Sequence, residues 1–163
     1  IKKRMQVDDA LAFLDLGMQY RDGGMGLPQD MNKAFELWSR AAKLGSSGAD
    51  ICLATAYQLG EGVEEDTNEA FHYYKLAAIG GDEKARFNLG ILEELNGNTN
   101  YAMKHFMIAA KSGEDDSLKE VGEGYKDGHV TKDEYASTLR AYQVSVNEMK
   151  SEQRSKAMEF ANK

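Results

Sequence analysis

Small and aromatic residues recur along the chain at a helical spacing. Ala34, Trp38, Ala41 and Ala42 stand at positions i, i+4, i+7 and i+8. This spacing places the four side chains on one face of an α-helix. No segment alternates apolar and polar residues with β-branched enrichment over the length of a strand. The pattern therefore predicts helices and no sheet.

The same apolar face occurs three times. Its later copies are Ala70, Tyr74, Ala77 and Ala78, and then Ala102, Phe106, Ala109 and Ala110. The alanine pairs begin at residues 41, 77 and 109, so successive copies are 36 and 32 residues apart. We expect the aromatic residue of each copy to lie in the core, and the alanines to let a neighbouring helix approach closely.

A second motif, a large apolar residue followed by a small one, precedes each copy. Its members are Leu16-Gly17, Leu53-Ala54, Leu89-Gly90 and a fourth, degraded copy at Val121-Gly122. We take the large residue of each motif as an equivalent core position. Each repeat is thus predicted to be a pair of helices.

Capping residues stand where these helices should begin and end. Asp30 and Asp66 precede second helices, and Thr131-x-x-Glu134 is a capping box. Glycines at 45, 81 and 113 follow second helices, where a left-handed residue is favoured. The predicted helices span about 8–22, 30–44, 47–59, 67–79, 82–95, 98–112, 115–127 and 132–149, with a further capping helix near 151–161.

Stacked helix pairs can bury apolar faces that a single pair would leave exposed. The sequence therefore predicts an all-α fold, an α/α superhelical solenoid of about four helix-turn-helix repeats with a helical C-terminal cap. We expect a single domain over residues 1–163. Its repeats are predicted at about 8–45, 46–81, 82–113 and 114–149.

The second repeat carries the most specific motif. Leu53-Ala54-x-x-Tyr57 leads into the loop Gly60-Glu61-Gly62-Val63, and Asp66, Ala70-Phe71 and Ala77-Ala78 follow. This pattern resembles the Sel-1-like repeat family, which is close to the tetratricopeptide type. The resemblance covers about residues 8–128 and implies an α/α superhelix with an adaptor or scaffold role. The third copy departs from it, because its loop is four residues shorter and lacks the Gly-x-Gly-Val sequence.

The whole chain, including residues 128–135 and 139–143, also resembles an expanded group of such proteins in diatoms and related algae. Members of that group can carry a RING-like zinc segment just upstream of a stretch like residues 1–5. The resemblance implies an alternative function, the substrate-recruiting part of a RING-type ubiquitin ligase.

Charge and composition exclude two classes of protein. The 163 residues carry 20 basic and 27 acidic side chains, a net charge of −7, which argues against a partner bound through nucleic-acid phosphates. No apolar run is long enough to insert into a membrane. One cysteine and no visible secretory signal predict an intracellular compartment, cytoplasmic by default, and a chain that is a processed product or fragment.

The sequence offers no catalytic, cofactor-binding or metal site. Neither glycine loop, residues 23–26 or 60–62, is followed by the Lys-Ser/Thr of a phosphate-binding loop. His72, His105 and His129 do not pair at the spacing of helical metal ligands, and Cys52 has no adjacent cation to activate it. We therefore expect a protein that is not an enzyme.

An acidic stretch extends over residues 44–74, which contain six acidic residues and no lysine or arginine. The simpler interpretation is negative charge that complements helix N-termini, together with a solvated loop. The alternative is a docking edge for a basic partner.

First helices line the concave face of helical solenoids. Residues two and five positions after each equivalent core residue should then point into the groove. These residues are Met18, Arg21, Thr55, Gln58, Ile91, Glu94, Glu123 and Lys126. Their mixed polarity favours a protein or peptide partner, so we expect a non-catalytic adaptor or scaffold. A structural subunit of a large assembly is a further alternative.

Overall fold

The computed structural model describes residues 2–161, and their side chains from residue 8 onward. The predicted domain limits at residues 1 and 163, and the side chains of residues 1–5, lie outside this part. The described chain is all helical and contains no strand. The helices are α1 (Lys2–Asp22), α2 (Met31–Lys43), α3 (Ser47–Leu59), α4 (Thr67–Ile79), α5 (Glu83–Leu95), α6 (Thr99–Lys111), α7 (Asp115–Lys126) and α8 (Lys132–Ala161).

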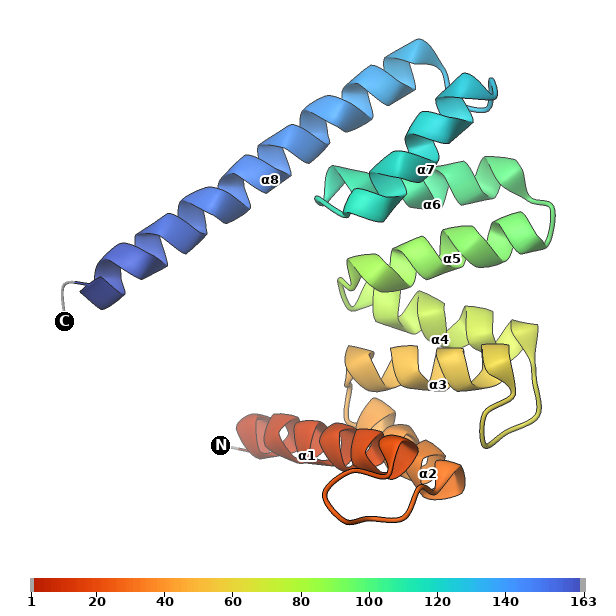
Figure 1. Ribbon diagram of the computed structural model, residues 1–163, viewed down its shortest axis with the longest axis vertical. Helices are drawn as coiled ribbons and strands as arrows, with labels where there is room; N and C mark the ends of the chain where they lie inside the picture. Colours follow the sequence, from red (N-terminus) through yellow and green to blue (C-terminus); the bar gives the residue numbers. More distant parts are fainter. Residues whose placement is uncertain (1, 162–163) are drawn as a thin grey trace. The chain divides into compact units, whose positions relative to one another are not determined.

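The helices form two compact units, divided within α5 after Ala85. In the first unit, α1 pairs with α2 and α3 pairs with α4 as antiparallel hairpins, and α2 packs on α3 (Figure 1). In the second unit, α6 packs against both α7 and α8, and α7 also contacts α8. The predicted pairs α1 with α2, α3 with α4, and α7 with α8 are thus in contact.

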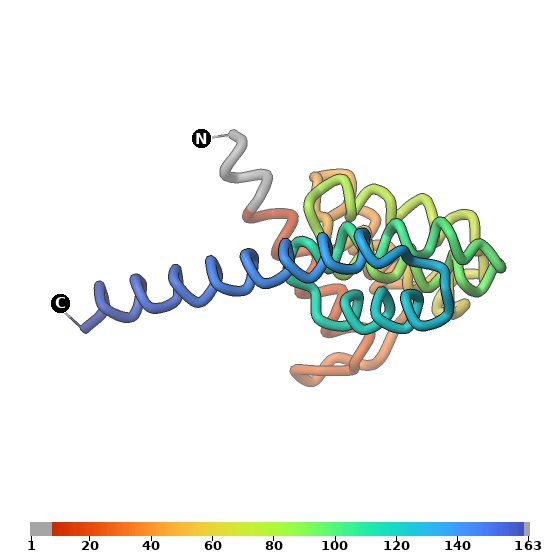
Figure 2. Tube along the Cα trace, turned by 90° about the horizontal axis from the view of Figure 1, so that it is seen from above, coloured from red at the N-terminus to blue at the C-terminus, as the bar shows by residue number. Residues whose placement is uncertain are grey.

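One predicted boundary is wrong. Residues 151–161 do not form a separate capping helix, because α8 is one continuous helix of 30 residues. No glycine or proline interrupts the chain around residue 150, so nothing ends the helix there. All side chains of residues 147–161 are exposed, and the last turns of α8 project beyond α6 and α7 (Figure 2).

The predicted caps are confirmed. The Asp30 side chain accepts a hydrogen bond from Lys33 N at 3.0 Å. In the capping box before α8, Thr131 Oγ1 accepts from Glu134 N at 3.2 Å, and Glu134 Oε2 accepts from Thr131 N at 2.8 Å. Asp66 also caps α4, but its own N–H donates to Tyr57 O, so only half of a capping box forms there.

Large aromatic residues of the second helices lie against small residues of the first. Trp38 is 2% exposed, and a Cβ atom added to Gly17 would lie 2.5 Å from its Nε1 atom. Likewise, any side chain at Gly90 would overlap the buried Phe106 ring. These contacts confirm the predicted pairing of small and large positions and the core assignment of the aromatic residues.

The core assignment of Leu16 is wrong, because this side chain is 38% exposed. Its equivalents Leu53, Leu89 and Val121 are buried as predicted. The reason is the position of Leu16 in the first helix of the first repeat. The described part of α1 packs mainly against α2, so the opposite side of α1 has no neighbour to cover it.

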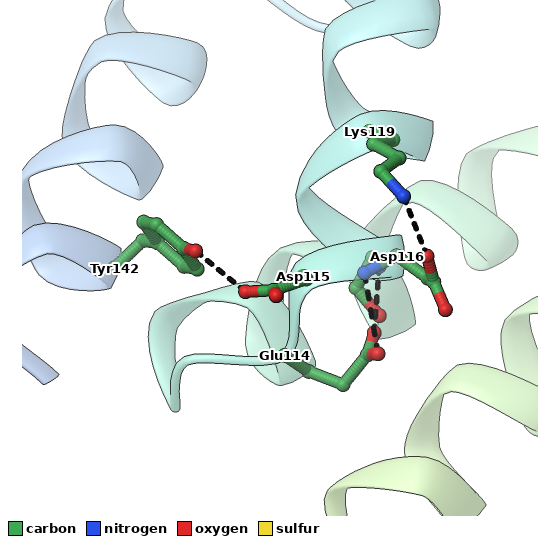
Figure 3. A network of polar contacts seen from close by, with 6 residues as sticks. Glu114, Asp115, Asp116, Lys119 and Tyr142 are labelled. Carbon is green, nitrogen blue, oxygen red and sulfur yellow. Dashed lines mark hydrogen bonds and ion pairs between the residues drawn. The ribbon is translucent and has the colours of Figure 1, made fainter. Parts of the chain in front are cut away.

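Polar contacts attach α8 to the other helices of the second unit. Tyr142 Oη donates a hydrogen bond to Asp115 Oδ1 at 2.5 Å, and this bond raises the pKa of the tyrosine (Figure 3). Ser145 Oγ donates to Lys111 O at 2.6 Å. Glu114 caps α7 next to this contact, accepting hydrogen bonds from Asp116 N and Ser117 N.

The first unit buries one carboxylate. Asp50 on α3 is 8% exposed, and within the described chain its carboxylate has no hydrogen bond and no ion pair. Burial raises its pKa from 3.8 to about 6, against the smaller opposing effect of His72. Keeping this group ionised at neutral pH therefore costs folding free energy.

Replacing Trp38 by alanine should lower the free energy of unfolding by about 3–5 kcal/mol, because it empties the largest buried aromatic site. Chemical denaturation of the purified protein measures the change. Phe160→Ala is the matched control, because that ring is 84% exposed, and we expect a change within ~0.5 kcal/mol. Equal losses in the two variants would contradict the core assignment.

Replacing Asp50 by asparagine should stabilise the protein above pH 6. The wild-type free energy of unfolding should fall as pH rises from about 4 to about 6, because the folded state holds the Asp50 proton more tightly than the unfolded state. At pH 7.5 the variant should gain on the order of 1–3 kcal/mol, and near pH 4 it should gain little.

Urea denaturation at both pH values tests this prediction. Glu36→Gln removes an exposed carboxylate of α2 and serves as the control, with no pH-dependent gain expected. A loss of stability in Asp50→Asn at pH 7.5 would show that the buried charge is compensated.

Candidate functional site

In the first unit, two of the predicted groove residues meet at one phenol. Thr55 Oγ1 lies 3.1 Å from Tyr74 Oη, and Tyr74 Oη donates a hydrogen bond to Gln58 Oε1 at 3.0 Å. A phenol has one proton to donate, so the hydroxyl of Thr55 is the donor in its own bond with Tyr74. The two half-buried side chains from α3 are therefore held in fixed orientations by a residue of α4.

The role of Tyr74 was not identified from the sequence, which placed this residue in the core only. Its ring is 2% exposed, as predicted, but its hydroxyl reaches the groove positions. Burial raises its pKa, so the phenol stays protonated at neutral pH. Tyrosine stands where the sister repeats have tryptophan and phenylalanine. Because a buried hydroxyl requires a hydrogen-bond partner, this difference between the repeats could have indicated the role of Tyr74.

The other two groove residues of this unit lie on α1. The side chain of Met18 is exposed, and the guanidinium of Arg21 bonds to Asp22 through Nε at 2.7 Å. This bond is the main cause of a raised Arg21 pKa, and the negative charges of Asp22 and Glu61 add to it. Burial raises the pKa of the Cys52 thiol, which argues against a reactive thiolate.

In the second unit, the groove residues of α5 differ from each other in exposure. Ile91 is half-buried and packs against the core cluster that contains Phe106 and Val121. Glu94 is exposed. Part of the Ile91 side chain therefore belongs to the core, and part of it remains accessible at the surface.

Acidic side chains from α5 and α7 come together in the second unit. Burial raises the pKa of Glu120, and the charges of Glu94 and Glu123 raise it further. Glu123 also forms an ion pair with Lys126, with Oε1 2.7 Å from Nζ. Glu120 could not be recognised from the sequence, because its closeness to Glu94 depends on how two helices pack.

The arrangement can form hydrogen bonds and ion pairs with a polypeptide. In the described chain, no three or more His, Cys, Asp or Glu side chains are placed to hold a metal ion. An open hollow of about 480 Å³ in the second unit lies between α6 and α8. Its lining includes two lysines, Met107, Ile108 and the acidic first turn of α8.

None of the described helices combines the length and the apolar character that a membrane crossing requires.

Comparison with known proteins identifies the repeats. A model of the Sel1 repeat family matches residues 10–46 and 52–82, which correspond to the two helix pairs of the first unit. Chitin synthase regulatory factor 4 of Schizosaccharomyces pombe is 32% identical over 109 residues, or 66% of this chain and 17% of that protein.

A second relative is a ligase component. The ERAD-associated E3 ubiquitin-protein ligase component HRD3B of Arabidopsis thaliana is 35% identical over 63 residues, or 39% of this chain and 10% of that protein. The chain thus spans 10–17% of the length of these curated relatives. The resemblance to the algal group stays a prediction.

Two solved structures share the fold. A protective antigen of uropathogenic Escherichia coli that displays an SLR fold is 31% identical, with a TM-score of 0.72, covering 90% of this chain and 32% of that one. A Sel1 repeat protein from Oxalobacter formigenes has a TM-score of 0.71 at 24% identity, covering 85% of this chain and 58% of that one. These structures confirm the predicted α/α repeat fold class.

Sel1 repeat proteins generally act as protein-interaction adaptors. The chain therefore contains Sel1 repeats, and the segments that the family model matches are its first two helix pairs.

Proposed function

We propose that this protein is a non-catalytic adaptor that binds a protein or peptide through the polar side chains of its first helices. The observation that supports this most directly is the Thr55, Tyr74 and Gln58 arrangement. A hydrogen-bonded set at the surface is already ordered, so a partner that uses it loses less conformational entropy on binding.

The second unit offers a different chemistry for the same role. The carboxylates of Glu94, Glu120 and Glu123 repel one another, which makes this surface favourable for a positively charged group. Hydrogen bonding in the first unit and charge in the second would each contribute to selectivity. An intracellular location is part of this proposal.

A second candidate function is the recruitment of substrates to a ubiquitin ligase. The likeness to HRD3B, a ligase component, favours it over the remaining alternative of a structural subunit. A ubiquitination assay with the full-length gene product, with and without a zinc chelator, tests it. Ubiquitin transfer that depends on zinc would support this role, and full-length product without transfer would contradict it.

Replacing Arg21, Gln58 and Glu94 together by alanine should reduce the capture of specific partners by about tenfold or more, equivalent to ~1.4 kcal/mol. The reason is the loss of two proposed contact side chains in the first unit and one in the second. Affinity capture followed by quantitative mass spectrometry measures the effect against wild type.

The control for this variant is Asn32→Ala, Glu36→Ala and Lys43→Ala on the exposed side of α2, which removes the same set of charges. Circular dichroism should show both variants folded. If the groove variant retains every partner that wild type retains, the groove proposal is wrong.

A further inference from the structure

Three aromatic rings form a row across the first unit. Phe35 of α2 meets Tyr57 of α3 edge to face, with ring centroids 5.5 Å apart. Tyr57 in turn stacks on Tyr73 of α4, with centroids 5.8 Å apart and an interplanar angle of 11°. All three side chains are half-buried, so part of each ring remains open to solvent. We call these residues the aromatic row.

Carboxylates surround this row. The pKa of Tyr57 is raised by burial and by the charges of Glu69 and Asp66. The pKa of Tyr73 is raised by burial, by Tyr57, and by Glu69 and Asp50. Glu69 of α4 therefore acts on both phenols, whereas Asp66 acts on Tyr57 and Asp50 acts on Tyr73.

Asp50 lacks a partner on this surface. The residue is 8% exposed, and its carboxylate acts on Tyr73 and has no hydrogen bond or ion pair in the part of the chain described. The exposed side chain of His72 has an opposing, smaller effect on the Asp50 pKa and makes a T-shaped contact with the Tyr73 ring. A buried carboxylate without a partner is costly, and a cation supplied from outside would offset that cost.

Some other aromatic rings of the chain already form cation–π contacts with basic side chains of the same chain. Lysine or arginine stands over four of them at 4.8–5.9 Å from the ring centroid. These pairs are Lys33 over Tyr20, Arg40 over Phe13, Lys75 over Phe71 and Lys104 over Tyr101. Among the described residues, no lysine or arginine lies over the aromatic row.

Residues 44–74 contain six acidic residues and no lysine or arginine, and their one basic side chain is the exposed His72. We propose that the aromatic row and its carboxylates bind an arginine-bearing or lysine-bearing segment of a partner protein. A guanidinium can stack on a tyrosine face while it donates hydrogen bonds to a carboxylate.

This surface is separate from the proposed groove. Tyr57 follows Thr55 by two positions, which are about 200° apart around a helix. The hydroxyl of Thr55 bonds to Tyr74, whereas the ring of Tyr57 contacts Phe35 and Tyr73. The inference therefore adds a second surface to the proposed function and does not depend on the groove.

Fluorescence anisotropy at pH 7.5 tests the proposal with the whole chain. The probe is a short labelled Gly/Ser peptide that carries two adjacent arginines. The same peptide with citrulline in place of arginine keeps the shape and removes the charge. We expect the citrulline peptide to bind about tenfold more weakly or worse, and added salt to weaken the arginine peptide.

Two variants test whether the arginine peptide binds at the aromatic row. Glu69→Lys puts a cation of the chain itself beside the phenols and should weaken the arginine peptide by about tenfold or more. Its control, Glu148→Lys, makes the same change of net charge on the exposed part of α8 and should have little effect. Tyr73→Leu should weaken binding several-fold, and Tyr101→Leu should not.

Specific outcomes would overturn the proposal. They are equal binding of the citrulline peptide, no binding of the arginine peptide up to about 1 mM, and equal losses in Glu69→Lys and Glu148→Lys. Displacement by spermine as effective as by unlabelled peptide would indicate a polyamine site instead. Circular dichroism checks that each variant is folded, and Glu69→Lys tests the surface even if Tyr73→Leu fails to fold.

The groove variant provides an independent check. The triple alanine variant of Arg21, Gln58 and Glu94 should bind the arginine peptide as wild type does. Failure of the groove proposal and failure of this one are therefore distinguishable. A loss of peptide binding in that variant would show that the two surfaces are one, which contradicts the assignment made here.

Discussion

The structure depends on close contact between a large ring and a position that has no side chain. Trp38 fills the space over Gly17, and Phe106 fills the space over Gly90. Each contact lets the two helices of a pair approach closely. The steric constraint acts in both directions, because a larger residue at the glycine would displace the ring and a smaller ring would leave a cavity.

In the second repeat, the buried ring also contacts residues of the proposed groove. Tyr74 occupies the position of Trp38 and Phe106, but its hydroxyl extends to Thr55 and Gln58 at the surface. One side chain thus joins the core to the proposed groove. On another side of α3, Tyr57 and Asp50 lie beside α4 in a surface of aromatic and acidic character. The same helix therefore presents two surfaces with different chemistry.

The helix pairs, their caps and their buried aromatic residues could be predicted from the sequence because local chemistry determines them. The Thr131 and Glu134 capping box is an example, since both partners lie within one turn. Contacts between helices were not predictable from spacing. Glu120 lies near Glu94, and Tyr142 bonds to Asp115, only because of tertiary packing. The prediction of a separate helix near residues 151–161 was wrong because the polar stretch around residue 150 contains no glycine or proline that would end α8.

The exposed end of α8 has a consequence for handling the protein. Lys150, Arg154 and Lys156 stand on helical turns whose side chains are all exposed. Such turns can unwind at low free-energy cost, because little packing is lost. Trypsin should therefore trim this end first and leave the packed part of the second unit, whose tertiary contacts would slow further cleavage.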